Sequence, residues 1–426
     1  LLVAGQADDA FVAGRDFVGA FAAQLGRSSH GLPRFARNDG GCRLHCFARH
    51  DRTFVIARSE ATRRSMDDHE PSSPSLSFTI ETFDDPETGQ PTQYGRFSRN
   101  WQHEEALDVL IDKLEAGQLS HKQALMQARK LEATAPYKLE IQNFIANRLW
   151  ALGLQDEATE VYEKAYKQAL AHIPKGFKGQ ITWSEVDNRP FLRLAHGTLL
   201  GLMRRRDKQG GEAAMALAKQ LLAWCPMDNI GVRFLLGDIA LLQGDHQAAM
   251  KEYLKGAPNS PAHWYQAALI AFREGDYVAA CTYLRRGIAA NPYIAEGLTG
   301  RTVLSEHLYW HASNVHGPEW AVDYLDSAAC DWTPQEIDFV DWVFNASPVL
   351  KERAEMMALH EGMTYERDAE KRAPYAQRSL DFIDRITDTL SKKMVRSVKN
   401  RWAIEIWPWD RAGFNRPVSP TSRHVQ

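Results

Sequence analysis

Apolar residues recur every three or four positions from Trp101 onward, a spacing that places them on one face of an α-helix. In "HEEALDVLIDKLEAG" this face holds Leu107, Leu110 and Leu114, and Gly117 marks the end of the helix. Further segments with the same spacing occur as far as Ile406. The pattern therefore predicts an all-α protein built from many packed helices.

A short internal repeat organises the middle of the chain. The recurring residues share one offset of 31 positions and are Gly244, Ala249 and Pro261 in the first copy and Gly275, Ala280 and Pro292 in the second. We expect two antiparallel helices per copy. The glycine turns the chain, the alanine lets the second helix approach the first, and the proline ends the second helix because it has no N–H to donate.

These residues resemble the tetratricopeptide repeat (TPR). The segments "NRPFLR" and "CPMDNIGVRFLL" are also similar to sequences of a bacterial tetratricopeptide family. "LRRGIAANPYIAEGL" and "EWAVDYL" show a more limited similarity to the suppression-of-tumorigenicity 7 family. The resemblance covers roughly residues 188–331. It implies a helical-repeat solenoid that acts as a scaffold for protein binding, and it brings no catalytic residues.

Composition and periodicity divide the chain into six predicted segments. Residues 1–65 contain no Met, no Lys and ten Arg, and we expect a mis-called or disordered extension there. The polar residues 66–100 are predicted to be a flexible lead-in. The later segments are the helical repeats at 101–292, an atypical Trp-rich helical cap at 293–374, an amphipathic C-terminal helix at 375–407 and a flexible tail at 408–426.

The first helices of tetratricopeptide repeats line the concave face of the array, and the repeat frame assigns nine residues to this lining. They are His196, Leu199, Met203, Phe234, Asp238, Leu241, Tyr265, Leu269 and Phe272. This mostly apolar groove lacks the Lys, Arg and Asn clamp with which some members of the family hold a carboxylate. It suits an amphipathic helix, either of a partner or the chain's own helix from Tyr375. Packing of the nine residues within the repeats is the alternative.

Charge and cysteine content narrow the expected partners. The formal net charge of −3 provides no basic field for nucleic acid. No apolar run approaches the roughly 18 residues that cross a bilayer, so no transmembrane segment is expected. Five cysteines without close pairing in the helical part predict reduced thiols and a cytoplasmic location. A protein or peptide partner is therefore expected.

Candidate chemistry is confined to histidines that follow the repeats. His307 and His311 are four residues apart and share a helical face, with Glu306 beside them, a spacing compatible with metal ligation. Leu308 stands where the H-E-x-x-H motif of zinc proteases has its glutamate. One hypothesis is a scaffold without a cofactor, in which these histidines pack in the interior or lie on the surface. The alternative is a metal-dependent enzyme that uses His307, His311 and Glu306.

Overall fold

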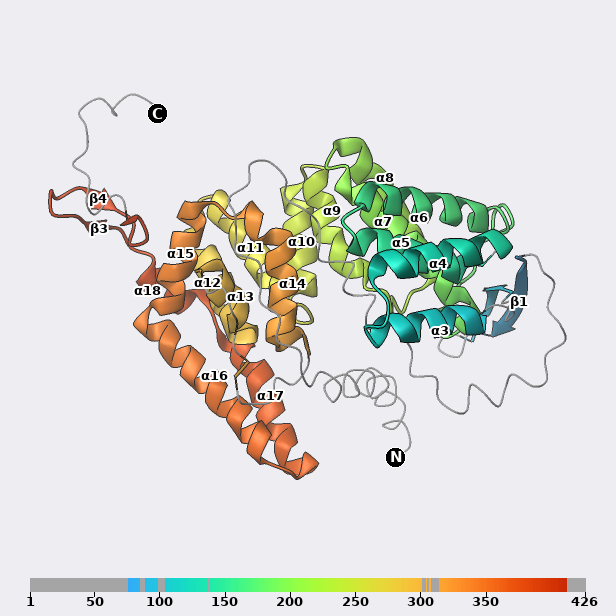
Figure 1. The fold of residues 1–426 in the computed structure, drawn as a ribbon. Helices are drawn as coiled ribbons and strands as arrows, with labels where there is room; N and C mark the ends of the chain where they lie inside the picture. The colour runs from blue at the N-terminus through green and yellow to red at the C-terminus, as the bar shows by residue number, and fades with distance from the viewer. Residues whose placement is uncertain are drawn as a thin grey trace, which may run out of the picture. The chain divides into compact units, whose positions relative to one another are not determined.

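The computed structural model describes residues 76–84, 89–98, 104–135, 138–300, 304, 306–307 and 314–411. Sixteen α-helices, α3 to α18, account for most of these described residues, together with two antiparallel two-stranded sheets (Figure 1). The predominantly helical class predicted from the periodicity is confirmed. The chain separates into an N-terminal unit that ends at Glu252 and a C-terminal unit that begins at Tyr253. The predicted extension at 1–65 lies outside the described residues.

The N-terminal unit is a succession of helices in which each helix from α3 to α9 packs against the next. Its elements are β1 (Phe78–Asp84), β2 (Pro91–Phe97), α3 (Glu104–Glu115), α4 (His121–Thr134), α5 (Leu139–Ala151), α6 (Gln155–Leu170), α7 (Arg189–Arg204), α8 (Lys208–Trp224), α9 (Leu236–Leu242) and most of α10 (His246–Gly256). One continuous core of Leu, Ile, Ala and aromatic side chains runs through α3 to α9.

The hairpin of β1 and β2 occupies part of the segment that was predicted to be a flexible lead-in. Its strands pair in the register Phe78↔Phe97. The buried side chain of Asn188 accepts a hydrogen bond from the Phe97 N–H at 3.0 Å and donates one to the Gly95 carbonyl at 2.9 Å. Because a side chain about 90 residues further along the chain supplies these bonds, local composition gave no sign of the hairpin. The lead-in prediction is wrong for these strands.

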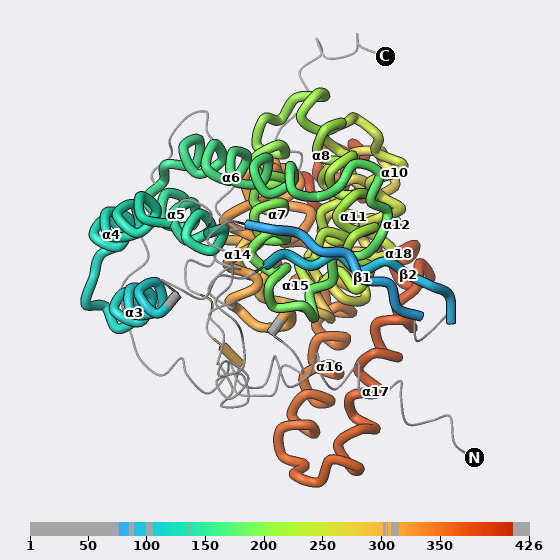
Figure 2. The backbone as a smooth tube through the Cα atoms, turned by 90° about the vertical axis from the view of Figure 1, so that its right-hand side faces the viewer, coloured from blue at the N-terminus to red at the C-terminus, as the bar shows by residue number. Residues whose placement is uncertain are grey.

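The C-terminal unit is arranged around α12, which packs against α11, α13 and α15 to α18. Its elements are α11 (Pro261–Arg273), α12 (Tyr277–Ala290), α13 (Pro292–Leu298), α14 (Pro318–Ala328), α15 (Pro334–Asn345), α16 (Ser347–Tyr365), α17 (Ala369–Arg385), α18 (Asp388–Met394), β3 (Val398–Lys399) and β4 (Glu405–Ile406). Figure 2 shows α16 and α17 as an antiparallel hairpin that extends away from the other helices of this unit.

Two of the three residue types that recur in the internal repeat, the glycines and the alanines, have the conformation and burial that were predicted. Gly244 and Gly275 have φ angles of 76° and 81°, the left-handed region that the turn between two helices requires. Ala249 and Ala280 are fully buried. The prolines differ from the prediction, because Pro292 is the first residue of α13 while α12 already ends at Ala290. The first position of a helix needs no N–H, so proline begins the next helix there instead of ending the previous one.

The amphipathic helix predicted at 375–407 is replaced by four shorter elements. The helical segment begins earlier, at Ala369, and α17 ends at Arg385 because Ile386 has extended backbone angles. The short helix α18 and the β3–β4 hairpin follow. Of the apolar residues that the amphipathic prediction places on one face, Ile386 is buried and Leu380 is 54% exposed. These residues therefore do not form one continuous contact surface.

Candidate peptide-binding site

The nine predicted groove residues fall into a buried and a partly exposed group. Leu199, Met203, Tyr265, Leu269 and Phe272 are buried. His196, Phe234, Asp238 and Leu241, all in the N-terminal unit, are partly exposed. In the C-terminal unit, all three predicted lining residues thus lie within the packed interior.

The face of α11 that was predicted to be the groove is covered by other parts of the C-terminal unit. The ring centroid of Phe272 lies 4.9 Å from that of Phe339 on α15 and 6.2 Å from that of Trp409. Tyr265 donates a hydrogen bond of 2.8 Å from its hydroxyl to the Asn291 carbonyl. A C-terminal segment does fold back onto this face, but it is the segment of Trp409. Helices α17 and α18 pack on α12 and α16 instead.

Trp409 is 1% exposed and lies in an aromatic pocket, although the sequence placed it in a flexible tail. Four rings from three helices form this Trp409 pocket, and they belong to Phe272 on α11, Tyr277 on α12, and Phe339 and Trp342 on α15. The tail prediction is wrong at this residue. Edge-to-face aromatic pairs contribute about 0.5–1.5 kcal/mol each beyond the burial of their area, so the pocket holds Trp409 firmly.

Two further contacts accompany the insertion of Trp409. The Trp407 ring stacks on it with a centroid distance of 5.2 Å and an interplanar angle of 9°. The Arg411 guanidinium forms ion pairs with Asp341 and, at 3.3 Å from Nε to Oδ1, with Asp338. Because the Arg411 side chain is 62% exposed and the Asp338 and Asp341 side chains are 35% and 29% exposed, the ion pairs add modest stability and mainly set the direction in which the segment leaves the pocket.

The indole N–H of Trp409 is buried and has no hydrogen-bond partner among the described residues. An unsatisfied buried donor costs about 1–3 kcal/mol. The affinity of the pocket for this side chain therefore comes from ring packing rather than from recognition of the N–H.

A tight turn aims the Trp409 segment at the pocket. The Asn400 side-chain oxygen accepts hydrogen bonds from the backbone N–H groups of Trp402 at 3.0 Å and Ile404 at 3.1 Å. Ala403 takes a φ angle of 61° within this turn. The pairing of Val398 with Ile406 then fixes the direction of the chain as it approaches Trp407 and Trp409.

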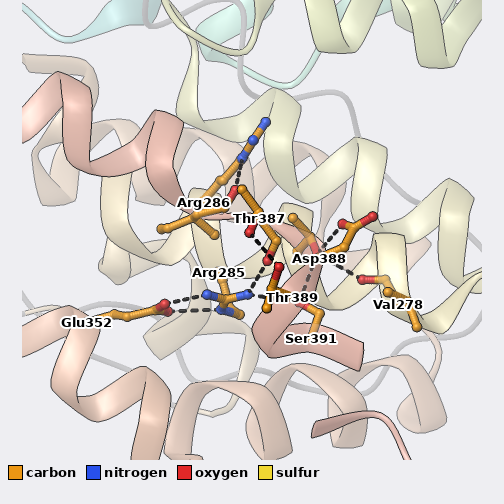
Figure 3. Close-up of polar contacts among 10 residues, drawn as sticks. Val278, Arg285, Arg286, Glu352, Thr387, Asp388, Thr389 and Ser391 are labelled. Atoms are coloured by element: carbon orange, nitrogen blue, oxygen red, sulfur yellow. Dashed lines mark hydrogen bonds and ion pairs between the residues drawn. The ribbon is translucent and has the colours of Figure 1, made fainter. Parts of the chain in front are cut away.

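A buried polar network holds α18, from which this turn departs, against α12 and α16 (Figure 3). Arg285 on α12 is 3% exposed and forms an ion pair with Glu352 on α16, with 3.0 Å between Nε and Oε2. It also donates hydrogen bonds of 2.9 Å to the Ser391 hydroxyl and the Thr387 carbonyl. The network thus fixes three helices to one another.

The neighbouring Cys281 is not a reactive thiol. Burial raises its pKa to about 11, so the sulfur stays protonated at neutral pH. Cys281 and Cys225 are free and buried, whereas Cys330 is disulfide-bonded. The prediction of reduced thiols therefore holds for Cys225 and Cys281 but not for Cys330.

The predicted histidine site is only partly described. His311 lies outside the described residues, and Glu306 is exposed. His307 is not helical, and its imidazole Nε2 lies 3.9 Å from Oε1 of the buried Glu296. The described residues contain no group of three His, Cys, Asp or Glu side chains that could hold a metal ion.

His307 instead lines a small cavity together with His316, His360 and Arg353. The cavity volume of about 20 Å³ has room for about one water molecule. His316 Nδ1 lies 2.7 Å from the Ala290 carbonyl oxygen, and desolvation lowers the pKa of this imidazole.

Comparison with known proteins found no match, so the function of the site is inferred from its geometry. No family model matches the chain, and no curated protein matches its sequence. No helix among the described residues is long and apolar enough to cross a membrane.

The sequence reasoning missed the residues of the Trp409 pocket other than Phe272. A signal for them was present in "IWPWD", where two tryptophans alternate with other residues, and in the Trp-rich segment that contains Trp342.

Proposed function

We propose that this chain is a protein-interaction scaffold of tetratricopeptide-like helix pairs and that the Trp409 pocket is its peptide-binding site. The observation that carries the proposal is the insertion of Trp409 among four aromatic rings of three helices. Tryptophan and arginine are among the residue types most enriched in binding hot spots. The C-terminal segment is therefore bound as a peptide ligand would be.

The contacts define the class of partner segment. The pocket accepts a tryptophan side chain, and Asp338 and Asp341 favour a basic residue two positions further along, as Arg411 stands after Trp409. A partner segment with this Trp-x-Arg pattern competes with the chain's own segment. Tethering gives the chain's own segment an effective concentration in the millimolar range, so the partner binds only when it displaces that segment.

The partly exposed residues of the N-terminal unit offer a second contact. His196, Phe234, Asp238 and Leu241 belong to successive first helices of the proposed repeats, and they are the part of the predicted groove that stays accessible. An amphipathic helix of a partner is the ligand that this mostly apolar set of the N-terminal unit suits, independently of the Trp409 pocket.

A peptide selection tests the proposal. The full chain with Trp407→Ala and Trp409→Ala is exposed to a displayed library of random peptides. Peptides with Trp followed two positions later by Arg or Lys should be enriched on this variant, since its pocket is empty. The same variant with Phe339→Ala is the control and should enrich none of them. Absence of any tryptophan-containing consensus would contradict the proposal.

A further inference from the structure

Helix α16 carries apolar side chains on its solvent face as well as on its buried face. Val349, Met356 and Met363 are buried against the rest of the unit. On another side of the helix, Leu350 is 45%, Met357 39% and Tyr365 79% exposed. The exposed apolar residues at helical spacing, here named the α16 stripe, are Leu350, Ala354, Met357, Ala358 and Tyr365, and the exposed Glu361 lies among them.

The other sides of α16 are already occupied within the unit. Helix α17 packs along one side, where Gly362 lies against the Tyr375 ring and Glu355 forms an ion pair with Arg385 at 3.5 Å. Helices α12 and α15 pack against α16 as well. A helix on the surface of a single unit normally shows polar residues to solvent, so apolar residues exposed from Leu350 to Tyr365, interrupted by Glu361, mark an interaction surface.

The charges on this surface indicate which partner fits. Lys351 lies beside the first turns of the stripe and Glu361 lies within its last turns, and both side chains are exposed. The stripe thus carries a positive charge towards one end and a negative charge towards the other. Between them, Ala354 and Ala358 are small enough for a second helix to approach closely.

We propose that the α16 stripe forms a two-fold symmetric contact with the same stripe of a second copy of this chain. The two helices run antiparallel, with the symmetry axis between Met357 and Ala358. Leu350 then lies opposite Tyr365 of the second copy, and Glu361 comes within one helical turn of the second copy's Lys351. A parallel arrangement would place like charges beside each other, which disfavours it.

The dimensions of the stripe set the strength of the contact. Residues 350–365 span about 24 Å of helix at 1.5 Å per residue. One helix pair of this length falls at the low end of specific interfaces, below roughly 1,200 Å² of buried surface. The expected dimer is therefore reversible, with a dissociation constant on the order of micromolar.

Sedimentation of the full chain over a range of concentrations tests this contact. Wild type should show a monomer–dimer equilibrium. Lys351→Glu and Glu361→Lys, each alone, should weaken the dimer at least tenfold because each places two like-charged pairs in the interface. Glu212→Lys, an exposed charge reversal on α8, should leave the equilibrium unchanged. Circular dichroism of each variant confirms that it is folded.

Mixing the two single variants gives the deciding result. The Glu361→Lys chain is basic at both positions and the Lys351→Glu chain is acidic at both, so every facing pair between them is of opposite charge. A heterodimer should therefore form with about the wild-type affinity. A wild-type chain that stays monomeric, single reversals without effect, or a mixture that stays monomeric would each overturn the proposed contact. None of these results depends on the Trp409 pocket, so the contact and the proposed function are tested separately.

Discussion

The Trp409 indole meets the Phe339 ring edge-on, with 4.8 Å between the ring centroids and 76° between the planes. Phe339 belongs to α15, which is separated from Trp409 by α16, α17, α18 and the β3–β4 hairpin. A residue near the end of the described chain thus packs into the core formed by helices that come much earlier in the sequence. This relationship makes the C-terminal segment a structural part of the unit and also a candidate for displacement by a partner.

Replacing Trp409 should destabilise the C-terminal unit more than replacing its neighbour. Trp409→Ala removes a fully buried ring, and large-to-Ala changes of this kind cost about 3–5 kcal/mol in free energy of unfolding. Trp407→Ala should cost clearly less, because Trp407 is 37% exposed. Urea denaturation of the two variants measures the difference. Equal costs would contradict the pocket geometry.

The unsatisfied indole N–H gives a second prediction at the same position. Trp409→Phe keeps most ring contacts and removes a buried donor that has no acceptor among the described residues. It should therefore retain more than half of the stability that Trp409→Ala loses. If Phe and Ala are equally destabilising in urea titrations, the N–H has a partner and the packing account is wrong.

The buried ion pair of Arg285 and Glu352 should show strong coupling. Removing one partner, as in Arg285→Met, leaves a buried charge uncompensated and costs about 3–5 kcal/mol. The double variant Arg285→Met with Glu352→Leu should be less destabilised than the sum of the single changes. A double-mutant cycle in urea measures this coupling. Additive effects would show that the two side chains act independently.

His316 should make stability depend on pH in a defined direction. Its folded-state pKa lies below the ordinary value of 6.5 because of desolvation. The unfolded chain therefore binds a proton before the folded chain does, and stability falls as pH drops below 6.5. His316→Asn keeps a donor for the Ala290 carbonyl and should reduce this loss, which is measured by thermal melts between pH 7.5 and 5. His246→Asn, at an exposed position, is the control, and an unchanged slope in His316→Asn would contradict the assignment.

The periodicity of the sequence predicted those features that neighbouring residues determine. Gly244 and Gly275 turn the chain and Ala249 and Ala280 are buried, because a turn and a helix contact depend on residues within about 30 positions. The roles of the prolines were mistaken because a missing N–H fits both the end of one helix and the beginning of the next.

The features that sequence reasoning missed depend on contacts between distant residues. Asn188 supports the β1–β2 hairpin from about 90 positions away, and Arg285 fixes α18 from about 100 positions away. Trp409 reaches Phe272 across more than 130 positions. No local pattern encodes such pairs, so only the tertiary structure reveals them.

The most direct test of the peptide-binding account supplies the segment in trans. A fluorescently labelled peptide of residues 398–411 is titrated with the full chain that carries Trp407→Ala and Trp409→Ala, and fluorescence anisotropy records binding. The account predicts saturable binding of the peptide to this variant. Binding to wild type should be at least tenfold weaker, because its own segment fills the pocket. A peptide with Trp409→Ala, and a protein with added Phe339→Ala, should each lose binding. Absence of binding to the emptied pocket, or binding that survives Phe339→Ala, would contradict the account.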